Sequence, residues 1–125
     1  IKIAKKAAEG IIITTSLDRD SKSKVTQDFI KAFEERAKHK VDMVGASAHT
    51  AVSVAVAALR KAGIEDKAAI RKAISETSLE ASTGTIAFNA LGEVKKDVQI
   101  QVVKDGNWRH HSIISDPKLL APPNK

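Results

Sequence analysis

The chain has 125 residues, which is typical of one compact domain and excludes a complete two-domain enzyme. Its 21 Lys and Arg residues against 15 Asp and Glu residues give a net charge of +6, and 42% hydrophobic with 29% charged residues is typical of a globular rather than a disordered protein. The absence of Cys excludes a disulfide framework, a thiolate zinc site and a cysteine nucleophile, but it leaves the cellular compartment open.

The two ends of the sequence carry further expectations. Residue 1 is Ile rather than Met, so we expect a processed product, an excised segment or the ordered part of a longer chain. The first residues lack the regions of a signal peptide, and no apolar run reaches the roughly 20 residues that a membrane span needs. The tail contains Pro117, Pro122 and Pro123, so we expect it to extend neither a sheet nor a helix.

The first structural zone predicts one strand. After a basic, Ala-rich turn, the β-branched run from Ile11 to Thr15 follows Gly10. Such a run, bounded on its other side by Asp18 and Asp20, predicts a fully buried strand of an α/β sheet.

The second zone predicts three amphipathic helices, over residues 23–39, about 42–62 and a short stretch after Asp66. Ser23 can cap the first helix, and the spacing of Glu34 and Lys38 predicts an ion pair near its end. His39 closes that helix, where we expect it to cap the negative end. The second helix, ended by Gly63, should bury one broad face: Val44, Ala48, Val52, Ala55, Val56 and Leu59. The third should bury Ala69, Ile70, Ala73 and Ile74.

In the third zone the hydrophobic period changes from 3.6 to 2. Residues 85–88 predict a short strand, and residues 98–102 alternate Val and Ile with Gln, which predicts a strand with one polar face. The Asp105-Gly106 pair predicts a two-residue hairpin turn that leads into a return strand over 108–114.

No group of residues predicts catalysis, metal binding or a cofactor. His110 and His111 should point to opposite faces of a strand, and no Asp or Glu neighbours them, so we expect exposed strand residues rather than a metal site. The sequence contains no nucleophile elbow and no Gly-rich phosphate loop, so we predict that the protein is not an enzyme. Basic residues alternate with acidic ones, and no aromatic residue lies within the most basic stretch, 60–72; we therefore predict no nucleic-acid partner.

Three stretches resemble, in their order and spacing, the C-terminal third of the periplasmic solute-binding proteins of the branched-chain amino acid type (type I). They are Glu9 to Ser16, Ala51 to Gly63 (AVSVAVAALRKAG), and Gly84 to Gly92 (GTIAFNALG) followed by Val98 to Gly106. The resemblance covers roughly residues 8 to 108. The sequence departs from the family pattern at His49-Thr50, where the family has Tyr-Asp, at Ala81 in place of Gly and at Asn89 in place of Asp.

The resemblance implies an α/β fold that is part of a two-lobe clamshell, with helices followed by a small antiparallel β segment. Residues 1–17 would be the end of the second-lobe sheet and a hinge crossover, 18–94 the first-lobe helical segment, and 95–125 the return to the second lobe with a β-hairpin and tail. Thr15, Ser16 and Leu17 would form the hinge. His49 takes the position of the family's aromatic residue near the cleft, which makes His49 and Thr50 the candidate ligand-binding residues; the alternative is a partly buried His49 in the first helical turn.

The function that the resemblance implies is that of the extracytoplasmic substrate-binding component of an ABC importer, for amino acids or similar small solutes. The partners would be a small amino acid-like ligand and an ABC permease, and the location periplasmic, extracellular or membrane-associated as a lipoprotein. Two alternatives are a ligand-sensing domain of a receptor or regulator with the same fold, and a standalone helical module that self-associates. The helices lack the parallel sheet that they would cover, so we expect an exchanged homo-oligomer or a complex with a missing N-terminal portion.

Overall fold

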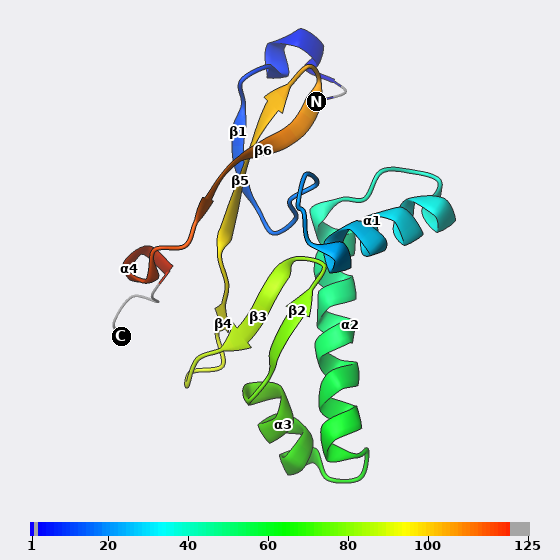
Figure 1. Cartoon of the computed structure of the whole chain (residues 1–125), viewed down its shortest axis with the longest axis vertical. Coiled ribbons are helices and arrows are strands. Elements are labelled where there is room, and N and C mark those ends of the chain that lie inside the picture. Colours follow the sequence, from blue (N-terminus) through cyan, green and yellow to red (C-terminus); the bar gives the residue numbers. More distant parts are fainter. Residues whose placement is uncertain (2, 121–125) are drawn as a thin grey trace.

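The computed structural model of the protein describes residues 1 and 3–120, and its chain leaves one sheet, builds a helical body and then returns to the first sheet (Figure 1). The elements in chain order are η1 (Lys5–Ala8), β1 (Ile12–Thr15), α1 (Lys24–Ala37), α2 (Met43–Ala62), α3 (Lys67–Ser75), β2 (Ser78–Ala81), β3 (Gly84–Phe88), β4 (Val94–Lys95), β5 (Val98–Lys104), β6 (Asn107–Ile114) and α4 (Pro117–Leu120). We call residues 17–95 the helical body.

Two three-stranded antiparallel sheets are present in the described residues, with strand orders β1-β5-β6 and β2-β3-β4. In the first sheet Ile12 lies opposite Val102 and Thr15 opposite Gln99. The helical body is therefore inserted between two neighbouring strands of one sheet, and Figure 1 shows that sheet above the body. The chain passes between the two parts just after β1 and again between β4 and β5.

The three helices begin at capping residues, and the prediction that Ser23 caps the first is confirmed. Ser23, Asp42 and Asp66 are the N-caps of α1, α2 and α3, and each accepts a backbone N–H of the first turn through its side-chain oxygen. For α2 the distance from Gly45 N to Asp42 Oδ1 is 2.7 Å. Gly63, with a φ of 77°, ends α2.

The hairpin turn between β5 and β6 is also confirmed. Asp105 and Gly106 have φ angles of 51° and 69°, the left-handed values that a two-residue turn of this kind requires. Their backbone N–H groups both donate to the carboxylate of Glu9, at 3.0 and 2.6 Å. Glu9 therefore connects the segment just before β1 to the turn between β5 and β6.

The core consists of two apolar clusters on opposite parts of the helical body. The first contains the buried Leu17, Val41 and Ala46, with Phe29, Ile30 and Phe33 packed against them. The second contains Val54, Ala81 and Ile86, with Ile74, Leu79 and Phe88 packed against them. Residues of α2 belong to both clusters, so this helix connects them.

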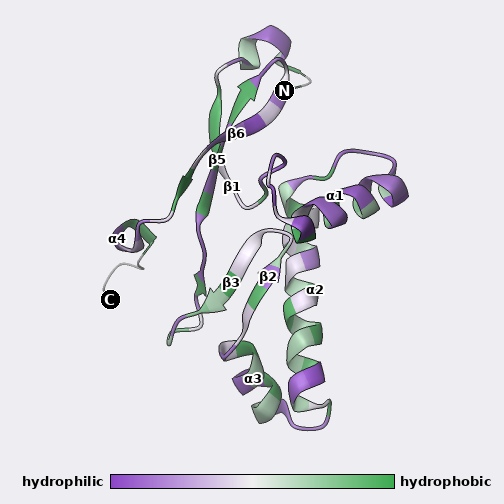
Figure 2. Ribbon diagram, in the orientation of Figure 1, coloured by the Kyte–Doolittle hydropathy of each residue, from purple (hydrophilic) through white to green (hydrophobic). Residues whose placement is uncertain are grey.

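The buried face of α2 is not the predicted one. The structure buries Ala46, Thr50, Val54 and Ala58, whereas Val44 and Val52 of the predicted face are 70% and 61% exposed. The helix is apolar on its buried side and on its exposed side, and Figure 2 shows hydrophobic colour along much of its length. Its side of small residues faces β2 and β3 because Ala and Thr allow close approach. The larger Val and Leu side chains are left on the outer side.

The structure corrects the expectation that no apolar run is long enough to span a membrane. By length and composition alone, α2 is long and apolar enough to cross a membrane, although most of that stretch is exposed here. A core helix of a water-soluble protein has the same composition.

Strand predictions need three corrections. β1 is not fully buried, because it lies at the edge of its sheet and Ile12 is 56% exposed. The strands β2 and β4 were not predicted, since they are short and irregular in pattern. The polar face of β5 does not face solvent, because Gln101 is fully buried.

The end of α1 and the tail also differ from expectation. Lys38 adopts a left-handed φ of 57° at the C-cap, so Glu34 pairs with Lys40 instead, at 3.1 Å. His39 does not cap the helix; its Nδ1 lies 3.0 Å from the Lys40 carbonyl oxygen and its ring packs edge-on against Phe33. Pro117 begins the one-turn helix α4, because Pro fits the first position of a helix, while Pro122 and Pro123 lie outside the described residues.

Leu17→Ala should lower the free energy of unfolding by about 2–5 kcal/mol, because it leaves a cavity in a cluster where Leu17 is fully buried. Urea unfolding followed by circular dichroism measures the change. Leu91→Ala, at a side chain that is 71% exposed, is the matched control and should change it by less than about 0.5 kcal/mol. Equal effects of the two substitutions would contradict the assignment of Leu17 to the core.

Candidate ligand-binding groove at the crossovers

A groove lies where the two chain passages meet. The pairing of Thr15 with Gln99 brings Ser16 and Lys96 to the same edge of the helical body. The groove has a volume of about 520 Å³, and we call it the hinge groove. Its lining residues are Ser16, Ser47, Thr50, Ala51, Val54, Thr83, Ile86, Phe88, Val94 and Lys96.

The lining divides into an apolar wall and a polar rim. The wall comes from α2, β3 and β4, through Val54, Ile86, Phe88 and Val94. The rim carries hydroxyl groups and a single charged side chain, Lys96. An apolar pocket with a few convergent polar groups is the usual composition of a site for a small organic molecule.

A chain of hydroxyl groups lies beneath the groove. Ser82 donates its one hydroxyl hydrogen to the carbonyl oxygen of Ala46, at 3.1 Å. It must therefore accept from the Thr50 hydroxyl at 3.1 Å, and Thr50 in turn accepts from Thr83 at 3.0 Å. His49 Nδ1 lies 3.0 Å from Ser82 Oγ, so we assign the hydrogen of the neutral ring to Nδ1.

The structure separates the two candidate ligand-binding residues. Thr50 is buried and lines the hinge groove, whereas His49 is exposed and is not among the lining residues. The His49 ring stacks on Phe29 of α1, with centroids 4.4 Å apart. His49 is connected to the groove residue Thr50 through Ser82, because the side chains of His49 and Thr50 both contact the Ser82 hydroxyl.

The three candidate hinge residues have different surroundings. Thr15 is buried, and its hydroxyl oxygen accepts the backbone N–H of Leu17 at 3.2 Å. Ser16 lines the hinge groove, while Leu17 lies in the first core cluster. Consecutive residues thus belong to the sheet, the groove and the helical body.

A turn that follows the crossover binds the helical body to the first sheet. Asp18 Oδ2 lies 2.8 Å from His110 Nδ1, and Asp20 accepts from Arg109 Nε at 2.9 Å. Arg19 donates to Gln101 Oε1 at 2.9 Å and to the Val41 carbonyl oxygen at 3.1 Å. No sequence signal shows these contacts, because the partners lie 82 to 92 residues apart or on unrelated segments.

Both histidines are exposed residues of β6, as predicted, but these contacts correct the expectation that no acidic residue neighbours them. His110 has an acidic neighbour in space, Asp18, although it has none in the adjacent sequence. The register between β5 and β6 shifts next to Gln101, so His110 and His111 do not follow a simple alternation. Among the residues that the structure describes, no group of three or more side chains could hold a metal ion.

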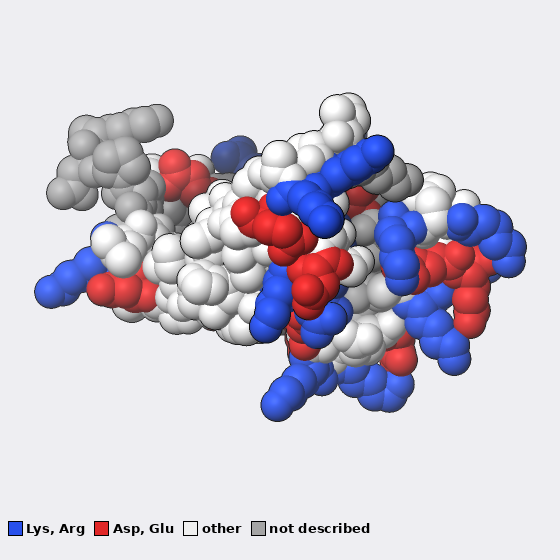
Figure 3. Space-filling view, turned by 90° about the horizontal axis from the view of Figure 1, so that it is seen from above, with Lys and Arg blue, Asp and Glu red and all other residues white. Residues whose placement is uncertain are grey.

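Basic and acidic side chains lie next to one another on the face shown in Figure 3.

Burial lowers the pKa of the Arg19 guanidinium, while Asp42 and Glu34 oppose that shift. Burial also lowers the pKa of Lys96, and no acidic group opposes it. Lys96 is thus the less compensated of these two cations.

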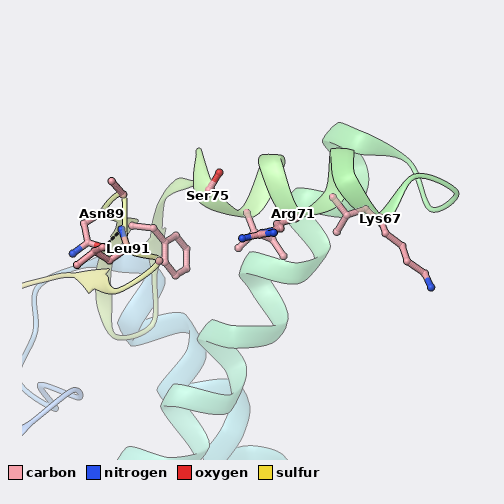
Figure 4. A pocket seen from close by; sticks show the side chains of 10 residues that line it. Lys67, Arg71, Ser75, Asn89 and Leu91 are labelled. Carbon is pink, nitrogen blue, oxygen red and sulfur yellow. Dashed lines mark hydrogen bonds between the residues drawn. The ribbon is translucent and has the colours of Figure 1, made fainter.

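A second groove, of about 650 Å³, lies between α3 and the turn after β3 (Figure 4). Arg71 lies over its middle, and Lys67 points away from Asn89 and Leu91. Asn89 is engaged in its own turn, where its Oδ1 accepts the backbone N–H of Leu91 at 2.9 Å. This groove shares Phe88 with the hinge groove but contains no residue of either crossover, so the hinge groove is the stronger candidate site.

Comparison with known families identifies the chain. The sequence profile described as periplasmic binding protein matches residues 1–107. The chain therefore belongs to the periplasmic binding protein family, as the resemblance predicted. The family is one of binding proteins, which confirms that the chain is not an enzyme. A comparison with curated protein sequences gives no match.

Solved structures confirm the type I fold. The leucine-, isoleucine-, valine-, threonine- and alanine-binding protein of Brucella ovis matches with a TM-score of 0.84 and 18% identity, over 98% of this chain and 35% of that one. A leucine-binding protein of Thermotoga maritima matches with a TM-score of 0.82 and 24% identity, over 94% and 34%. An ABC transporter solute-binding protein of R. palustris in complex with benzoate matches with a TM-score of 0.79 and 20% identity, over 90% and 32%. The chain thus spans about a third of the length of these relatives.

Ser82→Ala should lower the free energy of unfolding by about 1–3 kcal/mol, because it removes the buried acceptor of the Thr50 hydroxyl and a donor to the Ala46 carbonyl. It should also move the hydrogen of the neutral His49 ring from Nδ1 to Nε2. Urea unfolding measures the first effect and ¹⁵N NMR of the imidazole measures the second. Ser53→Ala, at an exposed hydroxyl bonded only within its own helix, should change neither; an unaltered His49 tautomer in Ser82→Ala would contradict the assigned chain.

Proposed function

We propose that the chain is the C-terminal part of the extracytoplasmic substrate-binding component of an ABC importer for amino acids or similar small organic solutes. The hinge groove carries this proposal, because it lies at both chain passages, where a small molecule could contact both parts of a clamshell. Residues 1–17 and 95–125 would then belong to the second lobe, and 18–94 to the first. The protein would act in the periplasm or outside the cell, as a free protein or a lipoprotein, and would deliver its ligand to a permease.

Ligand capture would be coupled to closure about the hinge. Thr15, Ser16 and Leu17 connect the sheet to the core of the helical body, so a rotation about them would move the two parts as rigid units. A ligand that contacts both parts favours the closed state only through contacts that the open state lacks. Thr50 would supply such a contact directly, and His49 would act through Ser82.

The ligand class follows from the groove and from the relatives. The solved relatives include one with leucine and one with benzoate, and both molecules combine an apolar body with a carboxylate. The hinge groove has an apolar wall and a polar rim that suit such a molecule. These features support a small organic carboxylate as the solute.

Thr50→Val should weaken binding of L-leucine or benzoate by about 10-fold, because it removes a hydroxyl from the groove wall and leaves Thr83 without its partner. Isothermal titration calorimetry of the isolated chain measures the affinity. Ser53→Ala is the matched control on the same helix and should leave it unchanged. The proposal fails if neither solute binds, or if both variants bind as the wild type does.

The outer face of α2 would need a partner. Val44 and Val52 are mostly exposed, and apolar surfaces of this kind rarely persist on monomers. We propose that either the missing N-terminal portion of the chain or a second copy, by exchange, covers this face. Both occupants would complete a layer against α2.

Native mass spectrometry of the protein as purified should give a mass above 13.4 kDa, either a multiple of it or a complex with an upstream polypeptide. Val52→Asp should weaken that assembly at least 10-fold, because it places a charge on the apolar face, whereas Ser53→Asp, at a position that is already polar, should change it little. A folded monomer that melts cooperatively at micromolar concentration would contradict this part of the proposal.

A further inference from the structure

Lys96 lies at the return crossover between β4 and β5, where three hollows meet. It lines the hinge groove, a second hollow beside Thr14, Thr15 and Ser16, and a third beside Thr83 and Ser115. The side chain is half-buried rather than extended into solvent. Its position places a cation at the point where the helical body meets the first sheet.

Lys96 has no protein partner within the part of the chain that the structure describes. No carboxylate pairs with it, and no hydrogen bond joins it to another side chain or to the backbone. Burial lowers its pKa, and the adjacent Asp97 lines the two outer hollows but not the hinge groove. A half-buried ammonium without a partner costs free energy, and an anion in the groove would offset that cost.

The rest of the groove favours one kind of anion. Its lining contains no Asp or Glu, so it offers no carboxylate to pair with an ammonium group of a ligand. The wall of Val54, Ile86 and Phe88 offers an apolar surface for a hydrocarbon body. The Ser16 hydroxyl on the rim can donate a hydrogen bond beside the ammonium of Lys96.

We propose that Lys96 is the carboxylate anchor of the hinge groove, and that the groove takes a small monocarboxylate with an apolar or aromatic body and no amino group. The carboxylate pairs with Lys96 and the body packs against Phe88 and Ile86. This inference rests on the proposed function, since it assumes that the hinge groove is the solute site. It goes further in naming the residue and the ligand class.

The test is a titration of the 125-residue chain with sodium benzoate, benzamide and L-leucine, followed by the ¹⁵Nζ resonances of the lysine side chains. Benzamide has the shape of benzoate without its charge. We expect benzoate to shift the Lys96 resonance saturably and to bind at least 10-fold more tightly than benzamide. Lys96→Met should weaken benzoate at least 10-fold and leave benzamide within 2-fold, and Lys96→Arg should restore part of the loss.

Lys95→Met is the matched control, because Lys95 is adjacent and exposed but does not line the hinge groove. It should leave benzoate binding within 2-fold. Circular dichroism shows whether each variant keeps its helix content, so a loss of binding can be separated from a loss of fold.

The outcomes separate this inference from the proposed function. Benzoate that binds Lys96→Met as well as wild type overturns the anchor, while the solute-binding proposal stands. L-leucine binding without benzoate binding overturns the ligand class and likewise leaves the function standing. If none of the three solutes binds, both proposals are overturned.

Discussion

The antiparallel pairing of β1 with β5 is the constraint on which the rest of the structure depends. It joins residues 12–15 to residues 99–102. Residues 16–98 therefore form one long insertion whose two ends lie next to each other at the end of the β1–β5 pair. Closing a long loop costs little more than closing a shorter one, because the entropic cost grows only with the logarithm of length. The pairing brings Ser16 and Lys96 to one groove, although 80 positions separate them in the sequence.

The crossover is held on both of its sides by different kinds of interaction. Leu17 is fully buried against Val41 and Ala46, so the helical body begins immediately after the sheet ends. The next three residues turn back and bind β5 and β6 through charged groups. Apolar burial fixes where the body starts, and the polar contacts determine how it is oriented against the sheet. Any change of angle between the two parts must break or slide these polar contacts.

Local signals in the sequence predicted local structure well. The N-caps Ser23, Asp42 and Asp66, and the Asp105-Gly106 turn, act on neighbouring residues, so their outcome does not depend on the rest of the fold. The buried face of α2 could not be predicted, because both sides of the helix are apolar and only the position of β2 and β3 selects one. The edge position of β1 likewise depends on which strands pair with it.

The candidate site was predictable only in part, for the same reason. The resemblance pointed to Thr50 and to the hinge residues, and the structure places Thr50 and Ser16 in one groove. The resemblance gave no indication of Ser82, Thr83 or Lys96, because their roles arise from contacts across more than 30 positions. A stretch of mixed charges such as residues 93–97 has the pattern of a solvated surface, and only the fold shows that Lys96 within it is half-buried.

The two cations near the crossovers show why burial alone does not define a functional group. Arg19 is desolvated, yet its guanidinium donates to Gln101 and to the Val41 carbonyl, and nearby acidic groups favour its charge. Its donors are engaged by the protein, so its role is to hold the helical body against the sheet. Lys96 is desolvated without any such compensation in the described residues, and its compact ammonium can serve a ligand that arrives and leaves. A charge that the fold satisfies stabilises the fold, whereas a charge that the fold leaves unsatisfied beside a groove is available to an anion from outside.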